Sequence, residues 1–184
     1  MKTFNLKNKK YLSHFTLLLI LVALLASCSA VPTRVPKIIY ESSLKADKII
    51  VDKSEQKLLL YKNNKIIRNY DATFGKIEGP KIYEGDKKTP EGKYFISNKN
   101  PRSKFFLSLA ISYPNVQDRA RAAAVGKPAG HSIMIHGQPN KSSLIERMKN
   151  EYKDWTDGCI AVSDRDMIEI YAMVDVHTPI TIRP

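Results

Sequence analysis

Cysteine is scarce in this chain, and its two cysteines lie in very different surroundings. The 184 residues contain only Cys28 and Cys159. Cys28 ends an apolar N-terminal segment, which makes it a poor structural partner for Cys159. Structural cysteines of exported proteins normally come in pairs. In an exported chain, the unpaired Cys159 is therefore a reactive thiol, an intermolecular partner or a buried inert residue. The residues around it distinguish between these roles.

The N-terminal segment lacks the length of a membrane-spanning helix. Its apolar core, "FTLLLILVALLA" at residues 15–26, has twelve residues, whereas a spanning helix needs about 20. Residues 1–10 before it carry four lysines and no acid. A positive start followed by a short apolar core is typical of a secretory signal. A short membrane-anchor helix is the alternative.

The end of this segment, "LASC" at residues 25–28, resembles the bacterial lipobox. In a lipobox, small residues precede a cysteine that is lipidated and becomes the new N-terminus. The resemblance implies a signal peptide at residues 1–27, a lipid on Cys28 and a tether over residues 28–46. We therefore expect an exported, membrane-anchored lipoprotein that faces the periplasm or cell wall.

The residue after Cys28 bears on the choice of membrane. In a bacterium with two membranes, Asp at this position commonly keeps a lipoprotein at the inner membrane, so Ser29 favours the outer one. The alternative is simple cleavage after Ser27 or Ala30, which would release a soluble protein.

No basic run in the chain is interleaved with aromatic residues, and this argues against nucleic acid as a partner. The net charge is +12, and loss of residues 1–27 lowers Lys+Arg from 30 to 26 against 18 acids, which leaves about +8. A basic exterior suits a cell-wall polymer or lipid head groups. We expect a monomer whose partners are the wall and the membrane.

No internal repeat or low-complexity tract divides the rest of the chain, and we expect one domain over residues 47–184. An alanine-rich segment predicts a helix at residues 115–125. Short apolar runs between turn residues predict strands at residues 48–52, 57–62, 65–74, 93–97, 105–112, 131–137 and 178–184. The first three should form an antiparallel meander.

Capping boxes predict two further helices. In a capping box, the side chain of a Ser or Thr accepts from the backbone N–H of an acidic residue three positions later, whose side chain accepts from the backbone N–H of the Ser or Thr. Ser143 with Glu146 precedes one helix, and Ser163 with Asp166 precedes the other. The expected fold class is mostly β (α+β), a single β domain of antiparallel or mixed sheets with two or three short helices.

A histidine that takes the proton of a thiol makes it a nucleophile. His177 lies in a turn, where histidine is usually structural. His131 and His136 share one expected strand, and side-chain alternation would put them on opposite faces. That geometry weakens a metal site built from both histidines and Cys159. Gly137 allows a sharp turn after the strand, which favours His136 as the partner of the cysteine.

Gly158, directly before Cys159, permits the positive φ that an exposed nucleophile with nearby N–H donors requires. Such donors could stabilise an oxyanion. From spacing alone, a buried inert thiol remains an equal alternative.

At this point the residues carry a family resemblance. "IHG" at residues 135–137, followed by "TDGCIAV" at residues 156–162, resembles the core of the L,D-transpeptidase (YkuD) catalytic domain. "GDKKTPEGKYFI" at residues 85–96 is similar to that family's G-D-x-x-T-P-x-G-x-Y/F-x-I stretch, and residues 57–76 resemble its opening hairpins. The resemblance covers residues 47–184.

The resemblance implies a fold, a reaction and a set of site residues. Cys159 would be the nucleophile and His136 the general base. The expected oxyanion and site-shaping residues are Gly158, Gly137, Thr156 and Asp157. The substrates would be peptidoglycan stem tetrapeptides, which form a thioester at Cys159 with loss of D-Ala, and no metal or organic cofactor is implied. The alternatives are an L,D-carboxypeptidase or amidase of the same fold, and a non-catalytic wall-binding lipoprotein.

One position departs from the family pattern. Many members carry an arginine where this chain has Ala161, and the resemblance leaves open which cation does its work. Arg102, Arg119 and Arg121 are candidates without positional support. The segment between His136 and the cysteine holds a full expected helix, which we interpret as an insertion that forms one wall of the cleft.

Overall fold

Residues 44–184 are described by the computed structural model of the protein. The expected signal peptide, Cys28 with its expected lipid, and the expected tether up to residue 43 lie outside the described residues. Within residues 44–184, no helix is long and apolar enough to cross a membrane. Ala46 is buried, and its N–H donates to Met173 O at 2.9 Å. The last residue of the expected tether therefore packs against the folded domain.

The N-terminal part of the domain is the expected antiparallel meander. Asn63 and Asn64 form its second turn with φ values of 50° and 60°, and asparagine tolerates this left-handed region well. The three strands are β1 (Lys48–Asp52), β2 (Lys57–Lys62) and β3 (Lys65–Asp71). Alternation of Ile49 and Val51 in β1 buries both side chains completely, as a period of two predicts.

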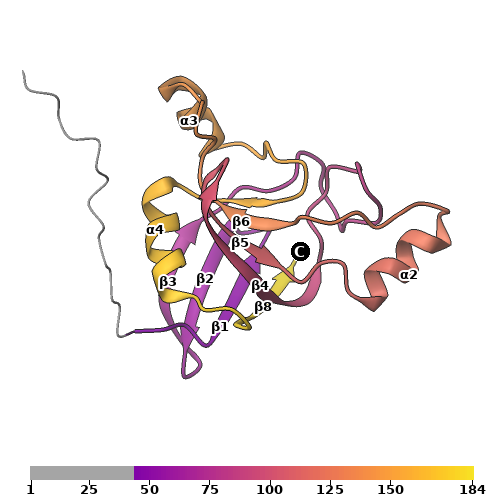
Figure 1. The fold of residues 1–184 in the computed structure, drawn as a ribbon, viewed down its shortest axis with the longest axis horizontal. Helices are drawn as coiled ribbons and strands as arrows, with labels where there is room; N and C mark the ends of the chain where they lie inside the picture. Colours follow the sequence, from indigo (N-terminus) through magenta and orange to yellow (C-terminus); the bar gives the residue numbers. More distant parts are fainter. Residues whose placement is uncertain (1–43) are drawn as a thin grey trace, which may run out of the picture. The chain divides into compact units, whose positions relative to one another are not determined.

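A mixed sheet of eight strands runs through residues 44–184 in the order β3-β2-β1-β8-β4-β5-β6-β7. The remaining strands are β4 (Gly92–Ser103), β5 (Phe106–Ile111), β6 (Met134–His136), β7 (Ile160–Ala161) and β8 (Pro179–Arg183). β8 pairs in parallel with β1, and β7 in parallel with β6. β4 pairs with β8 through residues 92–95 and with β5 through residues 96–103, so it joins the two parts of the sheet (Figure 1).

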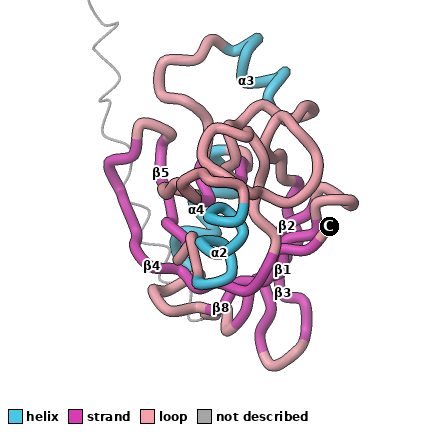
Figure 2. The backbone as a smooth tube through the Cα atoms, turned by 90° about the vertical axis from the view of Figure 1, so that its right-hand side faces the viewer, coloured by secondary structure: helices cyan, strands magenta, loops and turns pink. Residues whose placement is uncertain are grey.

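Three helices accompany the sheet in the described residues: α2 (Val116–Ala124), α3 (Leu144–Asn150) and α4 (Asp164–Met173). α4 packs against β5 and buries an apolar stripe made of Met167, Ile170 and Met173. α3 buries none of its residues, and it stands away from the sheet in both views (Figure 1, Figure 2). The expected fold class is confirmed.

The capping predictions are confirmed in full at one helix and in half at the other. At α3, Glu146 N donates to Ser143 Oγ and Ser143 N donates to Glu146 Oε2. At α4, Ser163 Oγ accepts from Asp166 N at 3.1 Å without the reciprocal bond. A further box opens α2, where Asn115 caps the helix; the sequence analysis identified that helix but not its cap.

The strand expected at residues 131–137 is shorter than predicted. β6 begins only at Met134, because Ser132 has a φ of +65°, which is incompatible with extended backbone. β7 was not predicted at all. Two residues are too few to show any periodicity.

Asp118 in the α2 cap is expected to contribute more stability than an exposed cap does. Its buried carboxylate accepts from Tyr94 Oη at 3.1 Å and from Asn115 N at 2.9 Å. Asp118→Ala removes the reciprocal bond of the capping box and leaves the buried Tyr94 hydroxyl without its carboxylate partner, which should lower the free energy of unfolding by about 2–4 kcal/mol. Urea unfolding measures the loss. Ser143→Ala, in the exposed cap of α3, is the matched control and should cost about 1 kcal/mol or less; equal losses would contradict the assignment.

Candidate active site

Cys159 lies directly before β7, at the end of a turn that Thr156 holds in place. Thr156 Oγ1 accepts from Gly158 N at 3.1 Å and donates to Cys159 O at 2.7 Å. Gly158 has a φ of +127°, and a Cβ there would stand 2.6 Å from Lys88 O. Both the backbone conformation and the space therefore require glycine at this position. The Gly158 N–H already has Thr156 Oγ1 as its acceptor. The oxyanion role of Gly158 stays a prediction.

The side chain of Cys159 is half-buried and lines a cavity of about 460 Å³. The predicted partner His136 lines the same cavity. The rest of the wall includes Lys76, Lys81, Phe105, His131, Ser132 and Trp155. The structure therefore brings together the two residues predicted as nucleophile and base, one from the turn before β7 and the other from β6.

The thiol of Cys159 is held mainly in its protonated form. Its Sγ lies 3.6 Å from Ser132 O, to which the S–H donates. Burial raises the pKa of the Cys159 thiol, and the charge of Asp157 raises it further, while the Met134 N–H and the charge of Lys81 act in the opposite direction. The thiol needs a base to become a nucleophile here.

His136 lies between two aromatic rings. Its imidazole stacks on Phe105 at a centroid distance of 4.4 Å and meets the edge of Trp155 at 5.7 Å. This burial lowers the pKa of His136, although the bond to Gly137 O opposes the shift. Nδ1 lies 2.7 Å from Gly137 O. Because a carbonyl oxygen only accepts, Nδ1 carries the hydrogen, and Nε2 keeps the lone pair that can take a proton.

The two aromatic residues were missed by the sequence analysis. Trp155 is the one tryptophan of the chain and stands four positions before the cysteine, which is the signal that could have identified it. Phe105 carries no such signal, because an aromatic residue at the start of an expected strand is usually part of a core.

The two remaining site-shaping residues act through packing and charge. A Cβ at Gly137 would stand 2.5 Å from Asp164 Oδ1, at the start of α4. The glycine therefore allows the histidine turn to approach the helix closely. Asp157 is exposed and pairs with Lys76 at 2.9 Å on the wall of the cavity.

The prediction that His131 and His136 face opposite sides of one strand is wrong. The positive φ of Ser132 interrupts the alternation, and His131 lies before β6, exposed, on the same cavity as Cys159. Its Nδ1 lies 2.5 Å from Ser132 Oγ. Within residues 44–184, no group of three or more His, Cys, Asp or Glu side chains is arranged to hold a metal ion.

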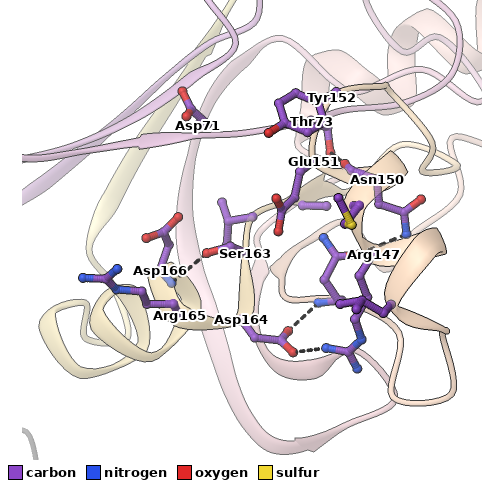
Figure 3. A pocket seen from close by; sticks show the side chains of 15 residues that line it. Asp71, Thr73, Arg147, Asn150, Glu151, Tyr152, Ser163, Asp164, Arg165 and Asp166 are labelled. Carbon is purple, nitrogen blue, oxygen red and sulfur yellow. Dashed lines mark hydrogen bonds and ion pairs between the residues drawn. The ribbon is translucent and has the colours of Figure 1, made fainter.

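The segment between His136 and Cys159 supplies Trp155, Thr156 and Asp157 to the wall of the cysteine cavity, but its helix does not line that cavity. α3 lines a different cavity of about 550 Å³, together with the start of α4 and with Ala161 (Figure 3). There Arg147 donates to Asp164 at 2.5 Å, and Figure 3 shows the two side chains pointing toward each other. The three candidate arginines do not line the cysteine cavity either; the lysines of its wall are Lys76 and Lys81.

The pH dependence of thiol alkylation follows from these pKa shifts. A raised pKa of the Cys159 thiol leaves little thiolate at neutral pH, and a lowered pKa of His136 keeps the imidazole uncharged down to pH values below about 6.5. We expect the rate of iodoacetamide labelling at Cys159, followed by peptide mass spectrometry, to rise steadily from pH 7 to pH 9. A fast, pH-independent rate near pH 6 would instead indicate a thiolate–imidazolium pair and would contradict this assignment.

Several known proteins resemble the chain, and three of them are YafK, Bd1075 and Pgp2. YafK of Escherichia coli strain K12 is 38% identical over 61 residues, which are 32% of this chain and 23% of YafK. The structure of Bd1075 from Bdellovibrio bacteriovorus matches with a TM-score of 0.53 and 28% identity, covering 76% of this chain and 48% of that chain. The helical cell shape determining protein Pgp2 from Campylobacter jejuni matches with a TM-score of 0.55 and 26% identity, covering 77% of this chain and 48% of Pgp2.

The chain thus spans about half the length of these two solved structures and matches less than a quarter of YafK. A family model covers more of it. The model described as "L,D-transpeptidase catalytic domain" (YkuD) matches residues 46–182, which include every strand and helix of the described domain except the last residue of β8. On this match, the chain belongs to the L,D-transpeptidase (YkuD) catalytic domain family.

Proposed function

We propose that this protein is a cysteine-dependent L,D-transpeptidase that acts on peptidoglycan stem tetrapeptides. One observation carries the proposal: Cys159 and His136 line one cavity, and the bond from His136 Nδ1 to Gly137 O leaves Nε2 as the ring nitrogen that can take the thiol proton. Family membership supports the reaction class. The basic charge of the chain suits an anionic wall polymer.

The first half of the proposed reaction forms a thioester. His136 Nε2 takes the proton of the Cys159 thiol, and the sulfur attacks the carbonyl carbon of the third residue of the tetrapeptide. In this proposal, the backbone N–H of Cys159 stabilises the negative charge on the carbonyl oxygen. The bond to D-Ala then breaks, and the imidazolium returns its proton to the leaving amine.

The second half transfers the acyl group. The amine of a second stem peptide, or of a protein, enters the cavity and attacks the thioester carbon. His136 takes a proton from that amine, the carbon–sulfur bond breaks, and the proton passes to the cysteine sulfur. A low pKa of His136 suits this cycle, because the imidazole must be uncharged at the start of each half.

A hydrolase of the same fold is the second candidate. Water in place of the acceptor amine would make the protein an L,D-carboxypeptidase or an amidase. Two observations favour this candidate: the chain has Ala161 where many members carry a cation, and it resembles Pgp2, which is named for cell shape rather than for transpeptidation.

Product analysis tests the proposal directly. The purified domain is incubated with disaccharide-tetrapeptide, and the products are weighed by mass spectrometry. Cross-linked dimers support the transpeptidase, a tripeptide monomer supports the hydrolase, and an unchanged substrate supports a wall-binding protein. Cys159→Ser should abolish product formation, and product from that variant would contradict the nucleophile.

The role of the base is tested with a matched pair of histidine variants. His136→Ala should lower the rate by about 10²-fold or more, the effect expected for a lost general base. His131→Ala is the control on the same cavity wall; its ring is exposed and bonded to Ser132, so the loss should be below about tenfold. Equal losses in the two variants would contradict the assignment of His136.

We further propose that Cys28 carries lipid and anchors the protein to a membrane, the outer one in a host with two membranes. Labelling with a palmitate analogue, followed by fractionation, tests the anchor. The wild type and Cys159→Ala should be labelled and membrane-bound, whereas Cys28→Ala should be unlabelled and soluble. An unlabelled, soluble wild type would refute the anchor without affecting the catalytic proposal.

A further inference from the structure

Lys81 is buried to a degree that is rare for a lysine. Its side chain and that of its partner Asp86 are each 4% exposed, and Lys81 Nζ lies 2.8 Å from Asp86 Oδ1. Nζ also donates to Tyr83 O at 3.0 Å. Desolvation makes such a lysine costly, and buried lysines are retained mainly where they are paired or have a function.

Asp86 fastens the loop that carries this lysine. Its carboxylate accepts N–H bonds from Ile82 at 2.7 Å, from Tyr83 at 3.1 Å and from Lys88 at 3.1 Å. Burial by itself would raise the pKa of Asp86, but these bonds and Lys81 hold it below its usual value. The carboxylate is therefore ionised and committed to the loop, and it orients the ammonium of Lys81.

The loop is also in contact with the nucleophile turn. A Cβ built on Gly158 would stand only 2.6 Å from Lys88 O. Lys81 itself lines the cavity of Cys159 and His136. Its positive charge favours the thiolate form of Cys159 and so opposes the rise in the pKa of that thiol. A fixed cation therefore lies on the wall of the cavity that holds Cys159, on a loop far in sequence from Ala161.

An ammonium has three N–H donors, and two protein acceptors lie on Lys81 Nζ among residues 44–184. The third donor is available to a ligand in the cavity. The other lysine of the wall, Lys76, is half-exposed and already pairs with Asp157. Lys81 is thus the cation best placed to meet an anionic group of a bound substrate.

We propose that Lys81 binds the terminal carboxylate of the residue that leaves, in place of the arginine that the family carries at the position of Ala161. The proposal rests on the proposed function. Once the scissile carbonyl carbon lies on Cys159 Sγ, only a nitrogen and a Cα, joined by bonds of about 1.5 Å, separate that carbon from the terminal carboxylate. A cation on the same cavity wall as Cys159 can therefore meet this group, whereas the other carboxylates of the stem peptide lie on more distant branches.

The test compares two substrates on the full-length protein: the tetrapeptide with a free terminal carboxylate and the same tetrapeptide with a terminal carboxamide. The wild type should prefer the free acid by about tenfold or more in kcat/KM, because a site built to bind a charged group rejects an analogue that lacks it. Lys81→Met should slow the free acid to the rate of the amide, so that the preference falls to about one. Lys81→Arg, which keeps the charge, should restore part of the preference.

Lys53 supplies the matched control. Its Nζ also donates to one carboxylate, Glu91, and to one carbonyl, Gly79 O, and its side chain is 12% exposed. Unlike Lys81, it lies outside the cysteine cavity. Lys53→Met should lower the melting temperature and leave the acid-to-amide preference unchanged.

Three outcomes would overturn the proposal, and they can be told apart. A Lys81→Met variant that slows both substrates equally, with the preference intact, would assign Lys81 to loop stability alone. A wild type that converts acid and amide at equal rates would refute carboxylate recognition without any variant, even if Lys81→Met fails to fold. A wild type that converts neither substrate would refute the proposed function, and this inference with it.

Discussion

Two residues of β7 pair in parallel with β6, so that Ile135 lies beside Ile160 and His136 beside Ala161. This short pairing joins segments that are more than twenty residues apart in the chain, and it places the cysteine turn next to the histidine. Ala161 N and O also bond to Thr73 on the opposite side. β7 is therefore held from two directions, and the position of Cys159 depends on that clamp.

The clamp has chemical value because the groups that it brings together are desolvated. The stack of Phe105, His136 and Trp155 excludes water from the imidazole and favours its neutral form. Burial likewise favours the neutral thiol. The resting imidazole and thiol therefore carry no charge. In the proposed reaction, charge develops on them only when the sulfur attacks a substrate carbonyl. A site of this kind relies on proton transfer rather than on a preformed thiolate.

The two lysines of the cysteine cavity each form an ion pair with an aspartate, and the two pairs differ in their exposure to solvent. Lys76 and Asp157 meet on its wall with both side chains well exposed, and such a pair contributes little to stability. Lys81 and Asp86 meet in the interior, where the loop supplies Asp86 with three backbone donors. The second pair is the one that can present a fixed cation to a ligand. The helix α3 lines the other cavity and contributes no residue to this one.

Local features were predictable because short-range physics sets them. The meander of β1, β2 and β3 follows from alternating apolar residues and an Asn-Asn turn, and the start of α3 follows from its capping box. Cys159 and His136 were identified because glycine beside each marks backbone that only glycine tolerates; Gly158 and Gly137 indeed leave no room for a Cβ. Strand periodicity failed as a guide where the backbone leaves the extended conformation. The positive φ of Ser132 is such a break, and it separates His131 from the strand that carries His136.

The sequence by itself therefore determined the order of the elements, the nucleophile and base candidates, and the glycines that frame them. Only the tertiary structure decided which groups share the cavity with Cys159. The aromatic stack on His136, the two-residue strand β7 and the burial of Lys81 all depend on contacts between residues distant in sequence. Burial and pairing of this kind arise only when the chain has folded into the sheet, so no periodicity or local propensity predicts them.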